Sequence, residues 1–363
     1  MAMPDRIAML QEAMDGAGTA LVALGPGPNM HWLAGFHPHP DERPCLLMVT
    51  AQGAGWLMPA LNAAEAQQHT DLPMWLWADA DGPDAALQAA LTGLGAASTK
   101  TVALDETMRT DFCLLLLGAL PEARPSVAAD TLGALRMCKD EAEMDALRMN
   151  AGIGDAAMDA IFAGAQPGMT EKEVAALARD VFAAHGAMPL FGIVGAGSNG
   201  AFPHHATGET VLKEGDAVVL DIGARKGDFS SDITRMAAIG AAPDGYAEVH
   251  AVVEAAVQAA LAAAKPGVPA SAVDQAARQV ITKAGYGEAF VHRTGHGMGL
   301  EGHEPPWITA TSETILKSGM VFSIEPGIYL QGRFGIRLEE IVILHDDGPE
   351  VLSKLPRGLR VIG

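Results

Sequence analysis

Three things are scarce in this sequence: cysteine, basic charge and long apolar runs. Its 363 residues include only three cysteines, Cys45, Cys113 and Cys138, in no spacing typical of a metal site. So few thiols are typical of a reducing compartment, and we expect a cytoplasmic protein. The formal net charge of −20 argues against nucleic acid and anionic membrane as partners, because both require a positive surface.

The lack of long apolar runs limits the location further. The opening segment, MAMPDRIAMLQEAMDGAG, mixes Asp, Arg and Glu into its apolar positions, so it lacks the apolar core of a signal peptide. No later stretch is long enough to span a bilayer. We therefore expect a soluble protein that has no membrane partner.

What the chain does have is enough apolar residues for sizeable cores. At 363 residues it is too long for one ordinary domain, and 49% of its residues are apolar. The prolines of PEARPS end the first part, and a long helix predicted at about 139–164 opens the next. We predict an N-terminal domain over 1–132 and a second domain over 133–363.

The N-terminal domain alternates between helical and strand-like segments. This alternation predicts an α/β unit with a mixed or parallel sheet. We expect helices at 4–16 and 84–94, and strands at 19–25, 45–50, 55–59 and 100–105.

The second domain contains an internal repeat. Segments 163–187 and 262–286 align without gaps at an offset of 99 residues, and each has a Pro-Gly turn followed by an amphipathic helix. The first helix has a capping box, Thr170-x-x-Glu173, and Ser271 is the expected cap of the second. The repeat predicts two related halves, each with a helix packed on strands.

Five potential metal ligands occur in the last 150 residues, each in a short and unusual motif. Four carboxylates and one imidazole form a hard, oxygen-rich set, which suits two divalent cations better than one structural zinc. Such a site indicates hydrolysis by a metal-activated water. The five are Asp221 in VVLDIGA, Asp232 in SSDITR, His296 in RTGHGMG, Glu325 in FSIEPGIY and Glu339 in GIRLEE.

Hairpin geometry places these carboxylates in pairs. A two-residue turn at 226–227 would put Asp221 directly opposite Asp232, with Cβ atoms about 5 Å apart. Two bare carboxylates at that distance repel, so a cation or a shared proton must lie between them. A loop centred on Gly332 would likewise bring Glu325 level with Glu339, although Pro326 interrupts the first strand.

A lone acid beside a hairpin is more often a solvated residue than a ligand. We expect this of Glu340, which strand alternation directs away from Glu339. Four acids in otherwise apolar strands are different, because buried carboxylates need partners.

The motifs together resemble the pita-bread metallopeptidases. The segments DIG and SDITR, HRTGHGMGLEGHE, EPGIY and GIRLE are most similar to the Xaa-Pro dipeptidase and Xaa-Pro aminopeptidase branch. NMHWLAGF is similar to an element of that branch's creatinase-like N-terminal domain. The resemblance implies an α+β protein: a pita-bread catalytic domain with pseudo-twofold halves, preceded by a smaller α/β creatinase/prolidase-like domain.

The resemblance also implies a role for each ligand. Asp221 would chelate one metal ion, His296 and Glu325 the other, and Asp232 and Glu339 would bridge the pair. A hydroxide between the ions would attack the scissile carbonyl, with Glu325 as general base. The two ions would be Mn²⁺, with Co²⁺ or Zn²⁺ as alternatives.

Four further residues join the site through the same motifs. His204, His292 and His303 match histidines that line the family's active site, where they would bind substrate and stabilise the oxyanion. Arg337 lies on the same strand face as Glu339 and would orient that carboxylate. For His292 the alternative is a neutral, structural histidine beside the site.

Other histidines have weaker claims. His205 is expected at the surface beside His204. His31, His37 and His39 are expected in loops, although in this family the N-terminal domain of one subunit can border its partner's site. The usual assembly would be a homodimer.

The implied activity is that of a dinuclear exopeptidase that hydrolyses the bond between an N-terminal residue and proline in a small peptide. Trp307 departs from the pattern, because some dipeptidases have at this position an arginine proposed to hold the substrate carboxylate. One alternative is therefore a same-fold enzyme that acts on a longer peptide or a non-peptide small molecule, such as a creatinase-like or ectoine-type amide hydrolase or a metal-dependent lyase. Another is a binding protein without catalysis.

Overall fold

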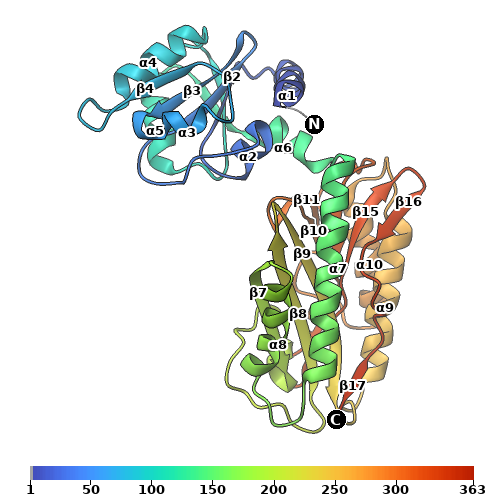
Figure 1. The fold of residues 1–363 in the computed structure, drawn as a ribbon. Coiled ribbons are helices and arrows are strands. Elements are labelled where there is room, and N and C mark those ends of the chain that lie inside the picture. Colours follow the sequence, from blue (N-terminus) through green and yellow to red (C-terminus); the bar gives the residue numbers. More distant parts are fainter. Residues whose placement is uncertain (1–2) are drawn as a thin grey trace. The chain divides into compact units, whose positions relative to one another are not determined.

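The computed structural model describes residues 3–363 and divides into two compact units, Met1–Arg136 and Met137–Gly363. The short helix α6, Leu132–Met137, lies at the junction. The limit between the two units and the predicted boundary after residue 132 therefore both fall within this helix. We describe each unit separately and call them the N-terminal and C-terminal units (Figure 1).

The N-terminal unit contains a six-stranded mixed sheet in the order β4-β3-β2-β1-β5-β6. Pairs β3–β4, β1–β5 and β5–β6 are parallel, and pairs β1–β2 and β2–β3 are antiparallel, so the predicted α/β unit with a mixed sheet is confirmed. The Gly/Pro-rich segment after the first strand forms helix α2 with Pro28 in its first turn. The strands are β1 Leu21–Leu24, β2 Leu46–Thr50, β3 Gly53–Pro59, β4 Met74–Trp77, β5 Thr101–Leu104 and β6 Arg124–Val127; the α-helices besides α6 are α1 Met3–Ala17, α2 Pro28–Ala34, α3 Ala63–Ala66, α4 Asp84–Gly93 and α5 Thr110–Ala119.

The C-terminal unit is built from strands with long helices packed against them (Figure 1). Its sheets have the orders β17-β9-β8-β7, β11-β10-β12-β15-β16 and β13-β14. The long helix expected at 139–164 is α7, Glu141–Gly164, which begins at a capping box on Asp140. The other helices are α8 Glu171–Ala184, α9 Tyr246–Ala263 and α10 Ala270–Lys283; the strands are β7 Met188–Ala196, β8 Ala217–Lys226, β9 Phe229–Ile239, β10 Gly295–Gly297, β11 Glu304–Ile308, β12 Val321–Ile324, β13 Gly327–Leu330, β14 Phe334–Arg337, β15 Glu340–His345, β16 Gly348–Val351 and β17 Arg360–Ile362.

Two apolar cores match the two predicted halves. In one core, α7 and α8 pack on the β7–β9 sheet through residues such as Ile161, Phe182 and Leu220. In the other, α9 and α10 pack on the C-terminal strands through residues such as Val257 and Phe322. In both halves the helices cover the strands, and the acidic side chains described below lie on these strands or directly beside them.

The internal repeat is visible in backbone hydrogen bonds. Gly168 N donates to Leu212 O at 2.9 Å, and its counterpart Gly267 N, 99 residues later, donates to Leu316 O at 2.8 Å. The first helix has the predicted capping box, in which Glu173 N donates to Thr170 Oγ1. The related halves predicted from the repeat are therefore confirmed.

The predicted cap at Ser271 is wrong. Helix α10 begins two residues earlier than a cap at Ser271 predicts, and its N-cap is Pro269, which has no side-chain acceptor. The first free amides of the helix instead donate to carbonyls of a neighbouring loop: Ala270 N to Thr314 O, and Ser271 N to Ser312 O. Because these backbone bonds satisfy the helix end, no side-chain cap is required. Within residues 3–363, no helix is both long enough and apolar enough to cross a membrane.

Candidate metal centre

Asp221 and Asp232 lie on the β8–β9 hairpin, but not directly opposite each other as predicted. Lys226 pairs with Phe229, so the turn is at 227–228, and Asp221 faces Thr234 while Asp232 faces Gly223. Gly227 has φ 65°, and a two-residue hairpin turn of type II′ places such a glycine first rather than second. The predicted register was therefore wrong by one residue at the turn. Because this moves the facing partner by two residues, both aspartates still point to the same face, as diagonal neighbours.

Glu325 and Glu339 are level with each other, as the loop centred on Gly332 predicts. On one side Ile324 pairs with Glu340, and on the other Gly327 pairs with Arg337. The strand pairing is interrupted between these two pairs, at Pro326. The residue numbers of the facing partners follow the same register on both sides of the interruption. The predicted level placement of Glu325 and Glu339 is confirmed.

His296 is fixed by the strands around it. Its flanking glycines leave no room for side chains, because a Cβ at Gly295 would lie 1.9 Å from Ser323 O and one at Gly297 would lie 2.2 Å from Pro305 O. The ring atom Nδ1 is 3.0 Å from Gly297 O and donates to it, which leaves the Nε2 lone pair free for a metal ion. Nε2 lies 3.2 Å from Glu325 Oε1.

The five predicted ligands converge, and His303 joins them. Their ligand atoms form three overlapping groups, each within 4.8 Å: Asp221, Asp232 and Glu339; His296, Glu325 and Glu339; and Asp232, His296 and His303. Asp232, Glu339 and His296 each occur in two groups, and Asp232 and Glu339 are the two that group both with Asp221 and with His296. The arrangement thus has two ends and a shared middle.

The electrostatics of this cluster fit a pair of divalent cations. Burial, and then the repulsion of neighbouring carboxylates, raises the pKa of Asp232 and of Glu339 well above the usual range. Two buried oxygens, Asp221 Oδ1 and Glu339 Oε1, have no hydrogen-bond partner among the described residues. Buried carboxylates without partners are costly, and oxygen-rich sets with one imidazole suit hard or borderline divalent metals.

Arg337 acts on a different carboxylate from the one predicted. Its Nη2 lies 2.5 Å from Asp221 Oδ2, and its Nε donates to Thr234 Oγ1 at 3.2 Å. The Thr234 hydroxyl in turn donates to Glu339 Oε2 at 2.8 Å. Arg337 therefore orients Asp221 directly and reaches Glu339 only through Thr234, because the diagonal hairpin register places Thr234 between them.

His292 is saturated by protein contacts. Its Nδ1 donates to Arg293 O at 2.7 Å, and its Nε2 accepts from Tyr329 Oη at 2.8 Å. Burial lowers the pKa of His292, so the ring is neutral at pH 7. The Tyr329 oxygen also accepts from Arg337 Nη1 at 2.8 Å, so these residues form one network beside the metal ligands.

His303 and His204 face the cavity beside the ligands. The His303 ring centre is 3.8 Å from that of His296, and Arg293 Nη2 lies 3.2 Å from His303 Nδ1. Burial and the neighbouring positive groups lower the pKa of His303 to about 4, so the ring is neutral and accepts a hydrogen bond from Arg293 at Nδ1. Its proton then lies on Nε2. The cavity measures about 560 Å³ and is lined by Phe191, Ile193, Pro203, His204, Asp221, Asp232, His292, Arg293, His296, His303, Glu325, Arg337 and Glu339.

Two expectations about the remaining histidines were wrong. His205 is half-buried, and its Nε2 lies 2.8 Å from Glu171 Oε2, because Glu171 is fully buried and draws its partners inward. His31 lies in helix α2, whereas His37 and His39 lie in the loop after it, as expected.

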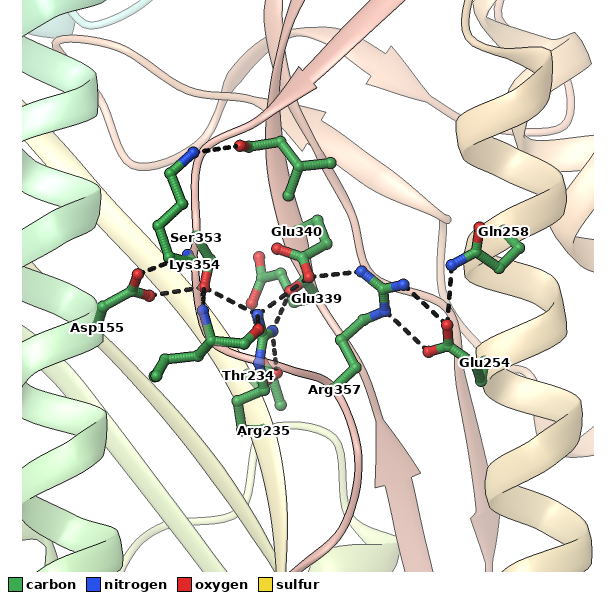
Figure 2. A network of polar contacts seen from close by, with 12 residues as sticks. Asp155, Thr234, Arg235, Glu254, Gln258, Glu339, Glu340, Ser353, Lys354 and Arg357 are labelled. Carbon is green, nitrogen blue, oxygen red and sulfur yellow. Dashed lines mark hydrogen bonds and ion pairs between the residues drawn. The ribbon is translucent and has the colours of Figure 1, made fainter.

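Glu340 is not solvated, contrary to prediction. It is 2% exposed and lies between two guanidinium groups, 3.0 Å from Arg235 Nη2 and 2.7 Å from Arg357 Nη1 (Figure 2). Arg357 also pairs with Glu254 of α9. Strand alternation does direct Glu340 away from the ligand Glu339, but the opposite face of the strand is also buried, so the acid needs these partners.

Thr234, Tyr329 and Arg293 were not identified as site residues from the sequence. Each lies within one of the quoted motifs, SDITR, EPGIY or HRTGHG, so motif membership was the available signal.

Comparison with known proteins agrees with this geometry. Residues 145–346 match metallopeptidase family M24, and residues 6–138 match the creatinase/prolidase N-terminal domain. The chain belongs to metallopeptidase family M24. This confirms the resemblance and, with it, the expected enzyme class.

Named members of the family match nearly the whole chain. The probable dipeptidase PepE of Mycobacterium tuberculosis is 40% identical over 368 residues, covering 98% of this chain and 96% of the relative. The Xaa-Pro dipeptidase of Pyrococcus horikoshii is 30% identical over 359 residues, covering 98% and 99%. The crystal structure of dipeptidase PepE from Mycobacterium ulcerans has a TM-score of 0.94 and 37% identity, covering 99% of this chain and 98% of that one. The predicted pita-bread domain with a smaller α/β N-terminal domain is confirmed.

Proposed function

We propose that this M24 metallopeptidase is a dinuclear exopeptidase that hydrolyses the bond between an N-terminal residue and proline. The observation that carries the proposal is the convergence of four buried or partly buried carboxylates and His296 on one cavity, with oxygens of Asp221 and Glu339 that have no partner among the described residues. Relatives named dipeptidase and Xaa-Pro dipeptidase support the substrate class.

The overlapping ligand groups support a division of the metal ligands. Asp221 would hold one ion and His296 and Glu325 the other, and Asp232 and Glu339, which group with both Asp221 and His296, would bridge them. When bound, the ions would supply an activated water and polarise the scissile carbonyl. We propose Mn²⁺ for its preference for carboxylates, with Co²⁺ and Zn²⁺ as alternatives.

The chain's own groups manage the proton and the developing charge. Burial opposes ionisation of Glu325, but the contact with His296 and the charge of Arg337 outweigh it and lower the pKa of Glu325 to about 2. Glu325 is therefore ionised at neutral pH and can accept a proton in the cavity. His303 presents an Nε2 proton, and with His204 it would donate hydrogen bonds to the substrate carbonyl.

The cavity also has an apolar wall. Phe191 and Ile193 project from β7, and Pro203 follows them in the chain. These residues would hold the apolar surface of a small peptide and exclude water from the cleavage site. We further propose that the chain acts as a cytoplasmic homodimer, on the grounds of its low cysteine content and the prevalence of twofold assemblies.

The direct test is a substrate panel on metal-reconstituted protein. Wild-type enzyme with Mn²⁺ should cleave Xaa-Pro substrates, and Asp232→Asn should lower kcat by at least about 1,000-fold, since it removes a shared ligand. Glu248→Gln, which changes an exposed acid in α9, is the matched control and should retain activity. Cleavage of guanidino or ectoine-type compounds, without cleavage of any Xaa-Pro substrate by metal-loaded protein, would contradict the proposal.

A further inference from the structure

Arg293 occupies a distinctive place at the cavity. It lies just before β10, and its guanidinium carbon stands 4.5 Å from the ring centre of Trp307 in β11. Its Nη2 is 3.2 Å from His303 Nδ1. The side chain is half-buried and forms part of the cavity wall, so its remaining N–H groups can reach a bound molecule.

The two arginines that line the cavity differ in how much of their bonding capacity is used. Arg337 is buried and bonded to Asp221, Thr234, Tyr329 and a backbone carbonyl. Arg293 has no carboxylate within ion-pair distance among residues 3–363, and its one side-chain hydrogen bond there goes to a neutral imidazole. Glu325 acts on Arg293 only from beyond ion-pair distance, so Arg293 is the cation in this wall that has no direct carboxylate contact within residues 3–363.

The position of Arg293 matches the reach of a dipeptide. The carboxylate of a dipeptide lies one residue beyond the scissile carbon, a span of at most about 3.6 Å. A group that binds it must therefore stand immediately beside the metal ligands. Arg293 meets this condition because it contacts His303, whose ring centre lies 3.8 Å from that of the proposed ligand His296.

We propose that Arg293, seated on the face of Trp307, binds the C-terminal carboxylate of a dipeptide and makes the enzyme select dipeptides over longer chains. This inference rests on the proposed peptidase function. The indole face restricts the guanidinium plane, so that the fork of N–H donors faces the cavity. Trp307 thereby positions the anion-binding group instead of replacing it.

The surroundings of Arg293 strengthen an ion pair with a substrate carboxylate. Burial lowers the pKa of Arg293, although the group stays cationic at neutral pH. A partly desolvated cation gains more from an anionic partner than a fully hydrated one does. A longer peptide has a neutral amide where the dipeptide has its carboxylate, so it would leave this cation unpaired.

The test compares a dipeptide with its amide. Wild-type enzyme loaded with Mn²⁺ should prefer Ala-Pro to Ala-Pro-NH₂, and Arg293→Gln should raise KM for Ala-Pro by about 10- to 100-fold, the range for a hydrogen bond to a charged group. The same variant should change KM for the amide by less than about threefold. Equal losses on both substrates would show that Arg293 only orients His303, and would overturn the proposal. An amide cleaved by the wild type as well as the dipeptide would also overturn it.

Further variants separate binding from folding. Arg293→Lys should keep part of the preference, and Trp307→Ala should weaken it while leaving kcat within about threefold, because exposed cation–π contacts contribute little. Inhibition by L-proline should weaken in Arg293→Gln, whereas inhibition by L-prolinamide should not. The control is Arg360→Gln. Arg360 belongs to β17, and its guanidinium carbon lies 5.3 Å from the ring centre of Phe162 in α7. Strand β17 is at the end of the unit opposite β10 and β11 (Figure 1).

A last pair of substrates distinguishes this proposal from the proposed function. Ala-Ala and its amide carry the same difference in terminal charge without proline. Wild-type enzyme that cleaves Ala-Ala but not Ala-Pro would refute the proline preference. The role of Arg293 would then be judged by the ratio of KM for Ala-Ala to KM for its amide. If Arg293→Gln kept the wild-type ratio, only the role of Arg293 would be refuted.

Discussion

Arg235 Nη1 donates a 2.5 Å hydrogen bond to the backbone carbonyl of Glu339, so a fully buried cation holds the segment that carries this proposed metal ligand. Its Nη2 binds Glu340, Ser353 Oγ and the carbonyl of Leu355. Ser353 donates to Asp155 of α7 (Figure 2). One guanidinium therefore ties the Glu339–Glu340 backbone to the C-terminal segment and, through Ser353, to a helix of the other half.

Arg235→Met should destabilise the protein and loosen its metal centre together. Removing a buried charge leaves Glu340 with one cationic partner and takes a donor from the carbonyls of Glu339 and Leu355, which costs about 3–5 kcal/mol. We expect a lower midpoint of urea unfolding and weaker Mn²⁺ binding by calorimetry. The double variant Arg235→Met/Glu340→Gln should recover part of the stability. A variant with unchanged metal affinity would show that the ligand strand does not depend on this support.

Thr234→Val should impair the metal centre with little change in shape. The substitution removes the hydroxyl that accepts from Arg337 Nε and donates to Glu339 Oε2, which leaves two buried charged groups short of a partner. We expect a loss of about 1–3 kcal/mol in stability. We also expect a drop of about tenfold or more in kcat/KM on Ala-Pro, the rate equivalent of about 1.4 kcal/mol. Thr234→Ser keeps the hydroxyl and should restore most of the activity, whereas failure of this rescue would assign the effect to packing.

Local pattern decided which parts of the site could be predicted. The level placement of Glu325 and Glu339 follows from symmetric pairing around Gly332, which strand spacing alone specifies. The placement of Asp221 and Asp232 depended on the type of turn between β8 and β9. A glycine in the first turn position gives a different strand register from a glycine in the second, and composition does not reveal which position Gly227 takes.

The environment of Glu340 illustrates what sequence could not supply. Strand alternation correctly directs it away from Glu339, but its burial depends on Arg235, Arg357 and a C-terminal segment that crosses the back of the strand. Such long-range partners come from tertiary packing and not from spacing. His205 was misplaced for the same reason, because its partner Glu171 lies 34 residues away in the chain.

Stability at acid pH should depend on Glu350. The hydrogen bonds from Arg148, against a small desolvation cost, lower the pKa of Glu350 to about 2 in the folded state. A lowered folded-state pKa contributes stability that is present above the unfolded value, near 4.3, and is lost as pH falls through about 2. Because both side chains are about a third exposed, solvent screening limits the effect to about 1 kcal/mol.

Glu350→Gln should therefore lower the unfolding free energy at pH 6 and converge with the wild type near pH 2. Urea titrations from pH 2 to 6 check this. Exposed Glu248→Gln changes an acid that has no such partner within residues 3–363, and this variant should run parallel to the wild type across the range. Parallel curves for Glu350→Gln and wild type would contradict the assignment.

Metal removal should expose the repulsion stored in the ligand cluster. Without cations, Asp232 is buried among Glu339, Asp221 and Glu325, and like charges so close destabilise the folded state. Asp232→Asn removes one of these charges, so the chelator-treated variant should melt at a higher temperature than the chelator-treated wild type. Addition of Mn²⁺ at 100 times its Kd should stabilise the wild type by about 2.7 kcal/mol per site and the variant by clearly less. The two melting temperatures should therefore change order between chelator and metal. A variant less stable than the wild type in chelator would mean that hydrogen bonds, rather than a cation, balance Asp232 in the folded protein.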